Sequence, residues 1–185
     1  MSQSSLDPIH GAFSTPPPTY PLGVSIADKV EIKEIDRRAA NTIYEAHHSY
    51  LPRGRQGWHY GVYLDGQTVG AITFDCWPSQ STIQGYESES IREVARVCIA
   101  HDTPNLASCA MSKAQDKFLK ERGDGIELLI TYVREGYAGS MFKALRGKGW
   151  EFDTISEGNA RGPHHGESEI HDIYKADKAR WVCEV

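Results

Sequence analysis

The sequence predicts an α+β fold, an α/β mixed sheet of six to seven strands flanked by helices. Two observations support this prediction. One strand-like segment precedes the helical segment 105–121 in the sequence and another follows it. A strand, helix, strand unit of this kind forms a right-handed crossover that joins two parallel strands. Two earlier strand-like segments are joined by Asp65-Gly66, a dipeptide that favours a tight antiparallel hairpin. One parallel pair and one antiparallel pair together require a mixed sheet.

Length and composition indicate one folded domain behind a flexible arm. The chain has 185 residues with 39% hydrophobic and 24% charged side chains, an ordinary globular mixture. Residues 1–29 contain five of the nine prolines, so we expect a flexible, proline-rich arm there and a folded domain over residues 30–185. The sequence has neither an apolar run long enough to cross a membrane nor a signal peptide, which predicts a cytoplasmic protein without membrane contact.

The charge balance and the cysteines exclude two classes of protein. The net charge of −5 argues against a broad basic face that holds nucleic acid, so any DNA contact must be local. The four cysteines are widely spaced without a CxxC pair, which indicates neither a disulfide framework nor a cysteine zinc site. The histidines His164, His165 and His171 fit no zinc spacing, so no metal site is predicted.

The first half of the chain combines a strand, a helix and the hairpin. A short strand starts at Val30, and Asp36 then caps a helix that runs to about His47. The buried stripe of this helix is expected at Ala39, Ile43 and either Ala46 or His47. A loop at 49–55 leads to the hairpin strands at 58–64 and 68–75.

The second half alternates between strands and helices. A strand at 91–100 leads into the helix at 105–121, whose apolar residues recur at helical spacing. The near-continuous apolar run 126–132 is typical of a strand that is buried on both faces. The remaining expected elements are a short helix at 139–146, strands at 150–155 and 180–185, and between those strands a mobile insertion at 156–172.

Two histidines end the first helix. His47 and His48 lie at its carboxyl end, where the helix dipole favours a cation, so we expect a raised imidazole pKa. Histidine titrates near physiological pH and is therefore suited to proton transfer. The alternative is that both residues only cap the helix.

Charged and polar residues mark the following strand and helix. Glu93 and Arg96 interrupt an apolar strand, and its two-residue period places them on opposite faces. A buried arginine needs a partner, so Arg96 is a candidate for binding a phosphate or carboxylate; a partnered core arginine is the alternative. Asn105 and Ser108 begin the next helix, where they bind an anion or act as caps.

Two local clusters of basic residues occur in this acidic chain. Arg53, Arg55 and Trp58 combine cations for phosphates with an aromatic ring for base stacking. Lys143 and Arg146 form the second cluster. Both clusters suit weak, salt-sensitive contact with DNA, and solvated loop charge is the alternative.

The order of elements is similar to that of the acyl-CoA N-acyltransferase (GNAT) fold. The resemblance implies a cofactor that lies where two central parallel strands splay, with its pyrophosphate at the start of the following helix. The glycine-rich phosphate loop of that superfamily is replaced here by Asp102-Thr103-Pro104-Asn105. The cofactor therefore stays unassigned, with acetyl-CoA or another acyl or glycyl donor as the candidates.

A series of short motifs occurs in a fixed order between residues 42 and 183. They are Glu45-Ala46-His47-His48 with Ser49-Tyr50, Tyr60-Gly61-Val62-Tyr63, Val69-Gly70-Ala71-Ile72, Glu93-Val94-Ala95-Arg96-Val97, Asn105-Leu106-Ala107-Ser108, Ile130-Thr131-Tyr132, Gly139-Ser140-Met141-Phe142-Lys143-Ala144 and Lys178-Ala179-Arg180-Trp181-Val182. In order and spacing this series resembles the Mom family of phage DNA-modification proteins. That family usually has an aspartate and then a His-x-Gly after the Ser/Thr-Tyr pair. This chain has Arg134 and Tyr137 there, with Glu135 as the nearest carboxylate.

The resemblance implies an enzyme that alters the N6 amine of adenine in double-stranded DNA and so protects phage DNA from restriction. The implied change is of the carbamoylmethylation type, from a small-molecule donor, in the cytoplasm of the infected host cell. The target amine lies inside a duplex, so the base must be flipped out or met unpaired. No oligomeric state is predicted. The catalytic candidates are His48, Tyr50, Ser108 and Glu135, those for substrate or donor binding are Arg96, Asn105, Tyr60 and Tyr132, and those for DNA binding are Arg53, Arg55, Trp58, Lys143 and Arg146.

Two alternative functions use the same fold. One is a GNAT-type, acetyl-CoA-dependent N-acyltransferase that acts on a small amine or a protein. The other is a non-catalytic, GNAT-like interaction protein, which would change no nucleoside.

Overall fold

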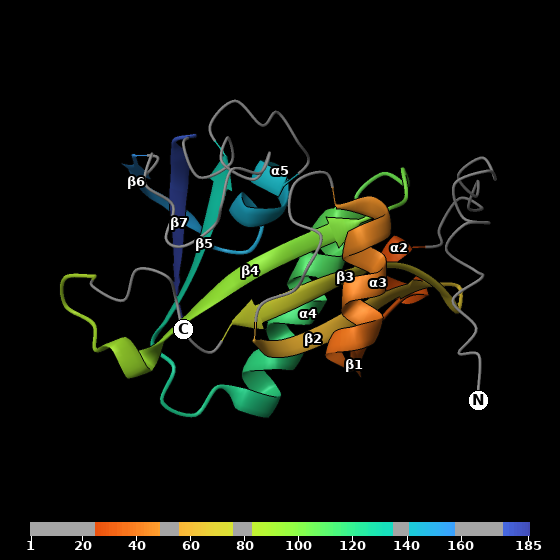
Figure 1. Ribbon diagram of the computed structural model, residues 1–185, viewed down its shortest axis with the longest axis horizontal. Helices are drawn as coiled ribbons and strands as arrows, with labels where there is room; N and C mark the ends of the chain where they lie inside the picture. The colour runs from red at the N-terminus through yellow and green to blue at the C-terminus, as the bar shows by residue number, and fades with distance from the viewer. Residues whose placement is uncertain (1–24, 49–55, 76–82, 135–140, 158–175) are drawn as a thin grey trace, which may run out of the picture.

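Seven strands form one mixed sheet in the order β1-β2-β3-β4-β5-β7-β6 in the computed structural model (Figure 1). The structure describes residues 25–48, 56–75, 83–134, 141–157 and 176–185. The strands are β1 (Val30–Ile35), β2 (Gly57–Leu64), β3 (Gln67–Asp75), β4 (Ile91–Ile99), β5 (Leu128–Arg134), β6 (Glu151–Ser156) and β7 (Lys178–Glu184). The predicted fold class and the hairpin of β2 and β3 are confirmed.

The parallel pair lies in the middle of the sheet. The helix α4 (Leu106–Arg122) joins β4 to β5, and these strands run parallel as predicted. Their pairing covers only residues 91–93 of β4 and 128–130 of β5, and the Thr131 hydroxyl donates a hydrogen bond to the Val94 carbonyl oxygen at 2.8 Å just beyond it. The strands then splay apart, as Figure 1 shows. Ligands bind at such carboxyl ends of parallel strands.

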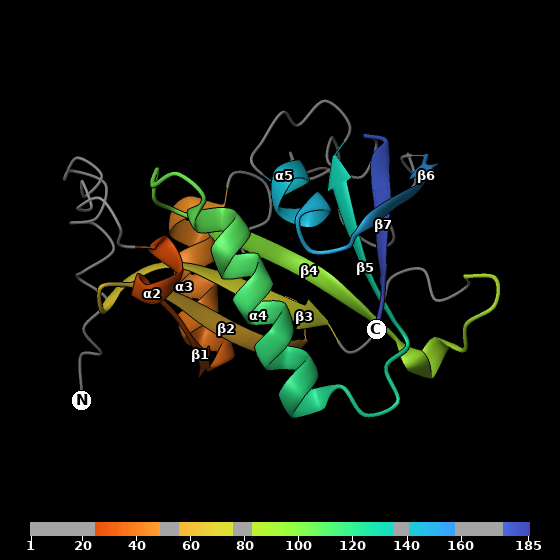
Figure 2. The same ribbon diagram turned by 180° about the vertical axis from the view of Figure 1, so that it is seen from behind.

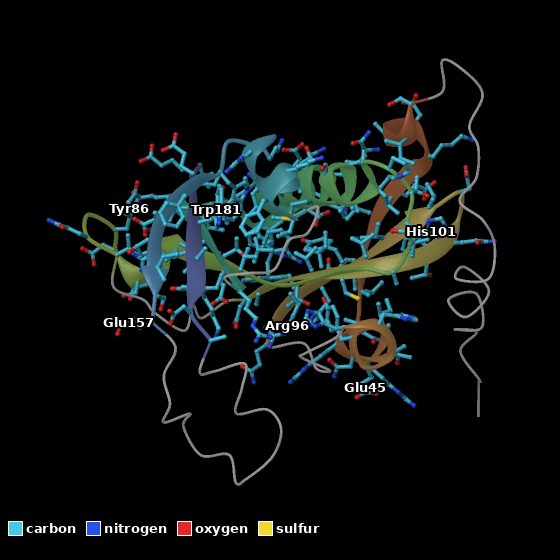
Figure 3. The ribbon with its side chains drawn as sticks, turned by 90° about the horizontal axis from the view of Figure 1, so that it is seen from above. Glu45, Tyr86, Arg96, His101, Glu157 and Trp181 are labelled. Atoms are coloured by element: carbon cyan, nitrogen blue, oxygen red, sulfur yellow. The ribbon has the colours of Figure 1, made fainter. Side chains whose placement is uncertain are left out.

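Helices cover both faces of the sheet. α3 (Arg37–His47) lies on one face, and α4 with α5 (Met141–Arg146) lies on the other (Figures 2 and 3). Among the described residues, no helix is both long and apolar enough to cross a bilayer.

The buried stripe of α3 differs from the predicted one. α3 buries Ala40, Ile43 and Tyr44, whereas Ala46 is exposed and Ala39 is half-buried. Of the predicted stripe, Ile43 is buried and His47 is half-buried. Ala40 and Tyr44 take the other inward positions, where the Tyr44 hydroxyl finds a hydrogen-bond partner in Thr73.

Aromatic side chains fill the layer between α4 and the sheet. Phe118 of α4 stacks on Phe74 of β3 with ring centroids 4.1 Å apart. Trp58 of β2 tilts against Phe118 at 5.5 Å, and buried Trp150 donates its Nε1 hydrogen to Gln115 Oε1 at 2.9 Å. This packing holds α4 against the sheet and therefore sets where its first turn lies.

The sequence did not predict two short helices. α2 (Ile26–Lys29) lies inside the segment expected to be a flexible arm, and Lys113 of α4 donates hydrogen bonds to the carbonyl oxygens of Ala27 and Val30 at 2.5 and 2.7 Å. Residues 25–29 therefore belong to the folded part. The second short helix, η1 (Ser88–Ser90), precedes β4. The rest of the predicted arm and most of the predicted insertion lie outside the described residues.

Gly57→Ala is expected to destabilise the protein by about 3 kcal/mol because the backbone there is strained for any other residue. Gly57 has φ +149°, and an added Cβ would lie 2.0 Å from the Phe74 carbonyl oxygen. Gly66→Ala is the control, since Gly66 has φ +81° but open space around it. Urea unfolding of both variants measures the difference, and equal losses would contradict this account.

Candidate active site

The carboxyl end of α3 brings His48 close to Arg96 of β4. The His48 amide donates to the Tyr44 carbonyl oxygen at 2.8 Å, and the two rings meet edge-on with centroids 6.0 Å apart. Burial, and then the Arg96 cation, lower the pKa of His48 to about 4. The predicted rise in pKa is therefore wrong, because desolvation outweighs the helix dipole. His48 is neutral at physiological pH and able to accept a proton.

A β-bulge places Glu93 and Arg96 on the same face of β4. Asp75 of β3 pairs with Glu93 and Thr73 pairs with Arg96, which leaves Ala95 as an extra residue in β4. The prediction of opposite faces is wrong, because this extra residue shifts the alternation by one. Glu93 is buried, and Arg96 Nη1 donates to the Ala95 carbonyl oxygen at 2.5 Å. Figure 3 shows Arg96 on the side of the sheet that carries α3.

Tyr132 lies on β5 in the part of the strand where β4 and β5 are no longer paired. It pairs with Arg180 of β7, and the two side chains are hydrogen-bonded. Arg180 Nε in turn donates to Asp153 Oδ2 at 2.5 Å. Burial raises the pKa of the Tyr132 hydroxyl. A hydrogen-bonded tyrosine and a second guanidinium therefore lie on the strands beyond the splay.

The start of α4 presents backbone amides. Asn105 occupies the N-cap position with φ 63°, in the left-handed region, and its side chain does not cap the helix. Within the described part of the chain, the amides of Ala107 and Ser108 have no hydrogen-bond acceptor. The Ser108 side chain is half-buried in this first turn. An uncapped helix start suits an anionic group, although the exposed Asp102 carboxylate just before it opposes a strongly anionic one.

Tyr60 lies in the core on the opposite face from Arg96, and half-buried Trp58 packs against that core. The Trp58 ring packs against Phe118, and fully buried Tyr60 donates its hydroxyl hydrogen to Glu121 Oε2 at 3.1 Å. The structure therefore does not present the Trp58 ring as a stacking surface for a base, and it keeps Tyr60, a candidate for substrate or donor binding, inside the core. Hairpin alternation alone did not reveal which face of the sheet each ring would take.

The second basic cluster also lies on the α4 side of the sheet. Arg146 is exposed, with its guanidinium 5.8 Å from the centre of the Trp181 ring, and Lys143 is exposed on the same short helix. Lys148 forms an ion pair with Asp116 at 2.6 Å. The structure thus separates Lys143 and Arg146 from His48 and does not bring them into one site.

Several predicted residues lie outside the described part of the chain. They are Tyr50, Glu135, Arg53, Arg55, His164, His165 and His171. Within the described ranges, no three His, Cys, Asp or Glu side chains form a group that could hold a metal ion. A shallow hollow on α3 contains none of the predicted site residues; it is lined by Arg37, Arg38, Asn41, Thr42 and Glu45.

Sequence reasoning missed a buried polar network under α3. The Thr73 hydroxyl lies 2.7 Å from the Tyr44 hydroxyl and 2.8 Å from His59 Nδ1. One signal was present in the sequence. Thr73 and Asp75 are spaced by two on an otherwise apolar strand, which puts two polar groups on one face.

The splayed parallel strands, the bulge in β4 and the helix that follows define the class of fold. Similar solved structures include the Escherichia coli ribosomal-protein-S18-alanine N-acetyltransferase (12% identity, TM-score 0.55, covering 84% of this chain and 94% of that one). A second is the IAA acetyltransferase from Bacillus cereus (14% identity, TM-score 0.56, covering 84% of this chain and 99% of that one). A third is a Bacillus subtilis acetyltransferase in complex with CoA (10% identity, TM-score 0.55, covering 85% of this chain and 98% of that one). The chain therefore has the fold of the GNAT acetyltransferases.

Within this fold class the chain belongs to the Mom protein family. The family model matches residues 29–179, which is most of the chain. The family resemblance of the sequence motifs is thus confirmed. No curated protein matches the sequence.

Proposed function

We propose that this protein is a transferase that modifies the N6 amine of adenine in double-stranded DNA and so protects phage DNA from restriction nucleases. The modification is of the carbamoylmethylation type, and the enzyme acts in the cytoplasm of the infected host cell. Family membership and the GNAT fold support a group-transfer reaction. The observation that supports it best is the bulge in β4, which puts Arg96 on the face of the sheet that carries α3, where its charge acts on His48 at the end of that helix.

The two residues have complementary roles in this proposal. A bond forms between the amine nitrogen and a carbon of the donor, while the bond from that carbon to its leaving group breaks. The nitrogen loses a proton as the new bond forms, and the neutral His48 imidazole accepts it. Burial and the Arg96 cation make this ring a weaker base than an exposed histidine. Arg96 stabilises the negative charge of the donor through its guanidinium. Tyr50 and Glu135 remain further candidates for proton transfer.

The donor is a small molecule bound between the splayed strands and the start of α4. In this proposal the amides of Ala107 and Ser108, together with the Ser108 hydroxyl, hold an anionic group there. The first turn lacks a glycine, and Asp102 adds a negative charge before it. These features disfavour the pyrophosphate of plain acetyl-CoA and favour another acyl or glycyl donor. Tyr132 lines the other side of the splay.

DNA from cells that express the protein tests this proposal. The DNA is digested to nucleosides and weighed by mass spectrometry, and we expect an adenosine of increased mass. His48→Ala and Arg96→Ala are expected to lower its amount about 100-fold or more, the size of a general-base contribution. Arg92→Ala is the matched control, because Arg92 is a half-buried arginine on the same strand that bonds the carbonyl oxygens of Glu89 and Ile91.

Two results would overturn the proposal. Unmodified adenosine despite abundant folded protein would favour an interaction protein. Thermal protection by acetyl-CoA without any nucleoside change would favour a GNAT-type N-acyltransferase that acts on a small amine or a protein.

A further inference from the structure

The hydroxyl of Thr73 joins two other buried polar side chains beneath α3. It lies 2.7 Å from the hydroxyl of Tyr44 and 2.8 Å from Nδ1 of His59. Tyr44 and Thr73 are fully buried and His59 is 4% exposed. A threonine hydroxyl donates one hydrogen bond and accepts others, so Thr73 can satisfy both partners at once. The network therefore links α3, β2 and β3 through a single oxygen atom.

An apolar cluster also packs under α3. Ala40, Ile43, Ala71 and Cys98 pack there with Tyr44. Replacing buried hydrogen-bonded partners by apolar groups of the same shape is often nearly neutral for stability, so packing alone does not require these polar groups. A fully satisfied buried network instead fixes one arrangement of the elements that it joins.

Both proposed transfer residues are tied to Thr73. Tyr44 lies one helical turn before His48, and its backbone carbonyl oxygen accepts the His48 amide hydrogen bond at 2.8 Å. The Tyr44 ring meets the His48 ring edge-on, with centroids 6.0 Å apart. On the neighbouring strand, Thr73 pairs with Arg96 beside the β4 bulge. A shift of the Tyr44 side chain therefore moves His48 relative to Arg96.

We propose that Thr73 is a positioning residue that sets the place of His48 relative to Arg96 through its hydrogen bond to Tyr44. His59 holds the Thr73 hydroxyl in the direction of Tyr44. This inference rests on the proposed roles of His48 and Arg96 in group transfer. Thr73 is buried below α3, so it acts through Tyr44 and not by touching DNA or donor.

Thr73→Val keeps the shape of the side chain and removes its hydroxyl. The amount of modified adenosine in cellular DNA is expected to fall on the order of 100-fold, as for a displacement of about 1 Å in a reacting group. Thr73→Ser keeps the hydroxyl and is expected to restore modification. Thr68→Val is the matched control, since Thr68 is a half-buried threonine on the same strand that lies outside the network.

NMR of the His48 ring gives a readout that does not depend on activity. In Thr73→Val, the ring signals are expected to shift and the titration midpoint of His48 to rise towards the ordinary 6.5; in Thr73→Ser, both are expected to match the wild type. Tyr44→Phe, which removes only one of the two hydrogen bonds, replaces the valine variant if that variant does not fold.

The two hypotheses fail in different ways. Wild-type modification together with unchanged His48 signals in a folded Thr73→Val protein would overturn the positioning role. Shifted His48 signals in a protein whose wild type modifies no nucleoside would overturn the proposed function and leave the structural link from Thr73 to His48 standing.

Discussion

Replacing Phe118 by alanine is expected to lower the free energy of unfolding by about 3–5 kcal/mol, the range for a large aromatic side chain lost from a core. Phe118 is fully buried, stacks on Phe74 at 4.1 Å and supports the Trp58 ring at 5.5 Å. The α4 helix would keep its other contacts, so the cavity would not close completely. Urea unfolding followed by circular dichroism measures the loss.

Phe152→Ala is the matched control for this prediction. Phe152 lies on the edge strand β6 and is 53% exposed. Its ring centroid lies 6.1 Å from that of Trp181. Its replacement is expected to cost about 1 kcal/mol or less, as for most surface positions. If the two alanine variants lost equal stability, the stacked rings of Phe118 and Phe74 would not be the centre of the α4-face core.

The fold was predictable from the sequence because its main signals are local. The Asp65-Gly66 turn fixes the hairpin register near its own position, and the helical spacing that includes Phe118 marks α4. The crossover from β4 to β5 then has one permitted handedness. The short helix α2 was missed because Lys113, far along the chain, holds it in place.

The site was less predictable because its geometry depends on contacts between distant segments. The extra residue Ala95 in β4 becomes visible only when β4 pairs with β3, and it turns Arg96 onto the face of Glu93. The pKa of His48 depends on how deeply α3 buries the ring, a tertiary property that outweighs the dipole of its own helix. Trp58 likewise packs on a helix sixty residues away, which a composition argument cannot reveal.

The His48 imidazole is expected to titrate near pH 4 and not near its ordinary value of 6.5. Burial is the larger cause, because the low-dielectric surroundings disfavour the charged ring, and the Arg96 cation adds to it. NMR titration of histidine-labelled protein measures this midpoint directly, and a His48→Asn variant assigns the signal. A wild-type midpoint near 6.5 would mean that the ring is solvated and that it is half charged at mildly acidic pH.

The direction of the shift fixes the pH dependence of both stability and transfer. The folded-state pKa of about 4 lies below 6.5, so the unfolded chain takes up the proton first and His48 makes the folded state less stable as pH falls from 6.5 towards 4. The neutral ring that accepts a proton is nearly fully populated above about pH 5, so the rate of group transfer should not decline near pH 6.5.

Arg96→Ala is expected to raise the titration midpoint of His48 only in part, because burial of the ring remains. Arg92→Ala, on the other face of β4, is expected to leave it unchanged, and an equal rise in both variants would show that Arg96 does not act on His48 through its charge.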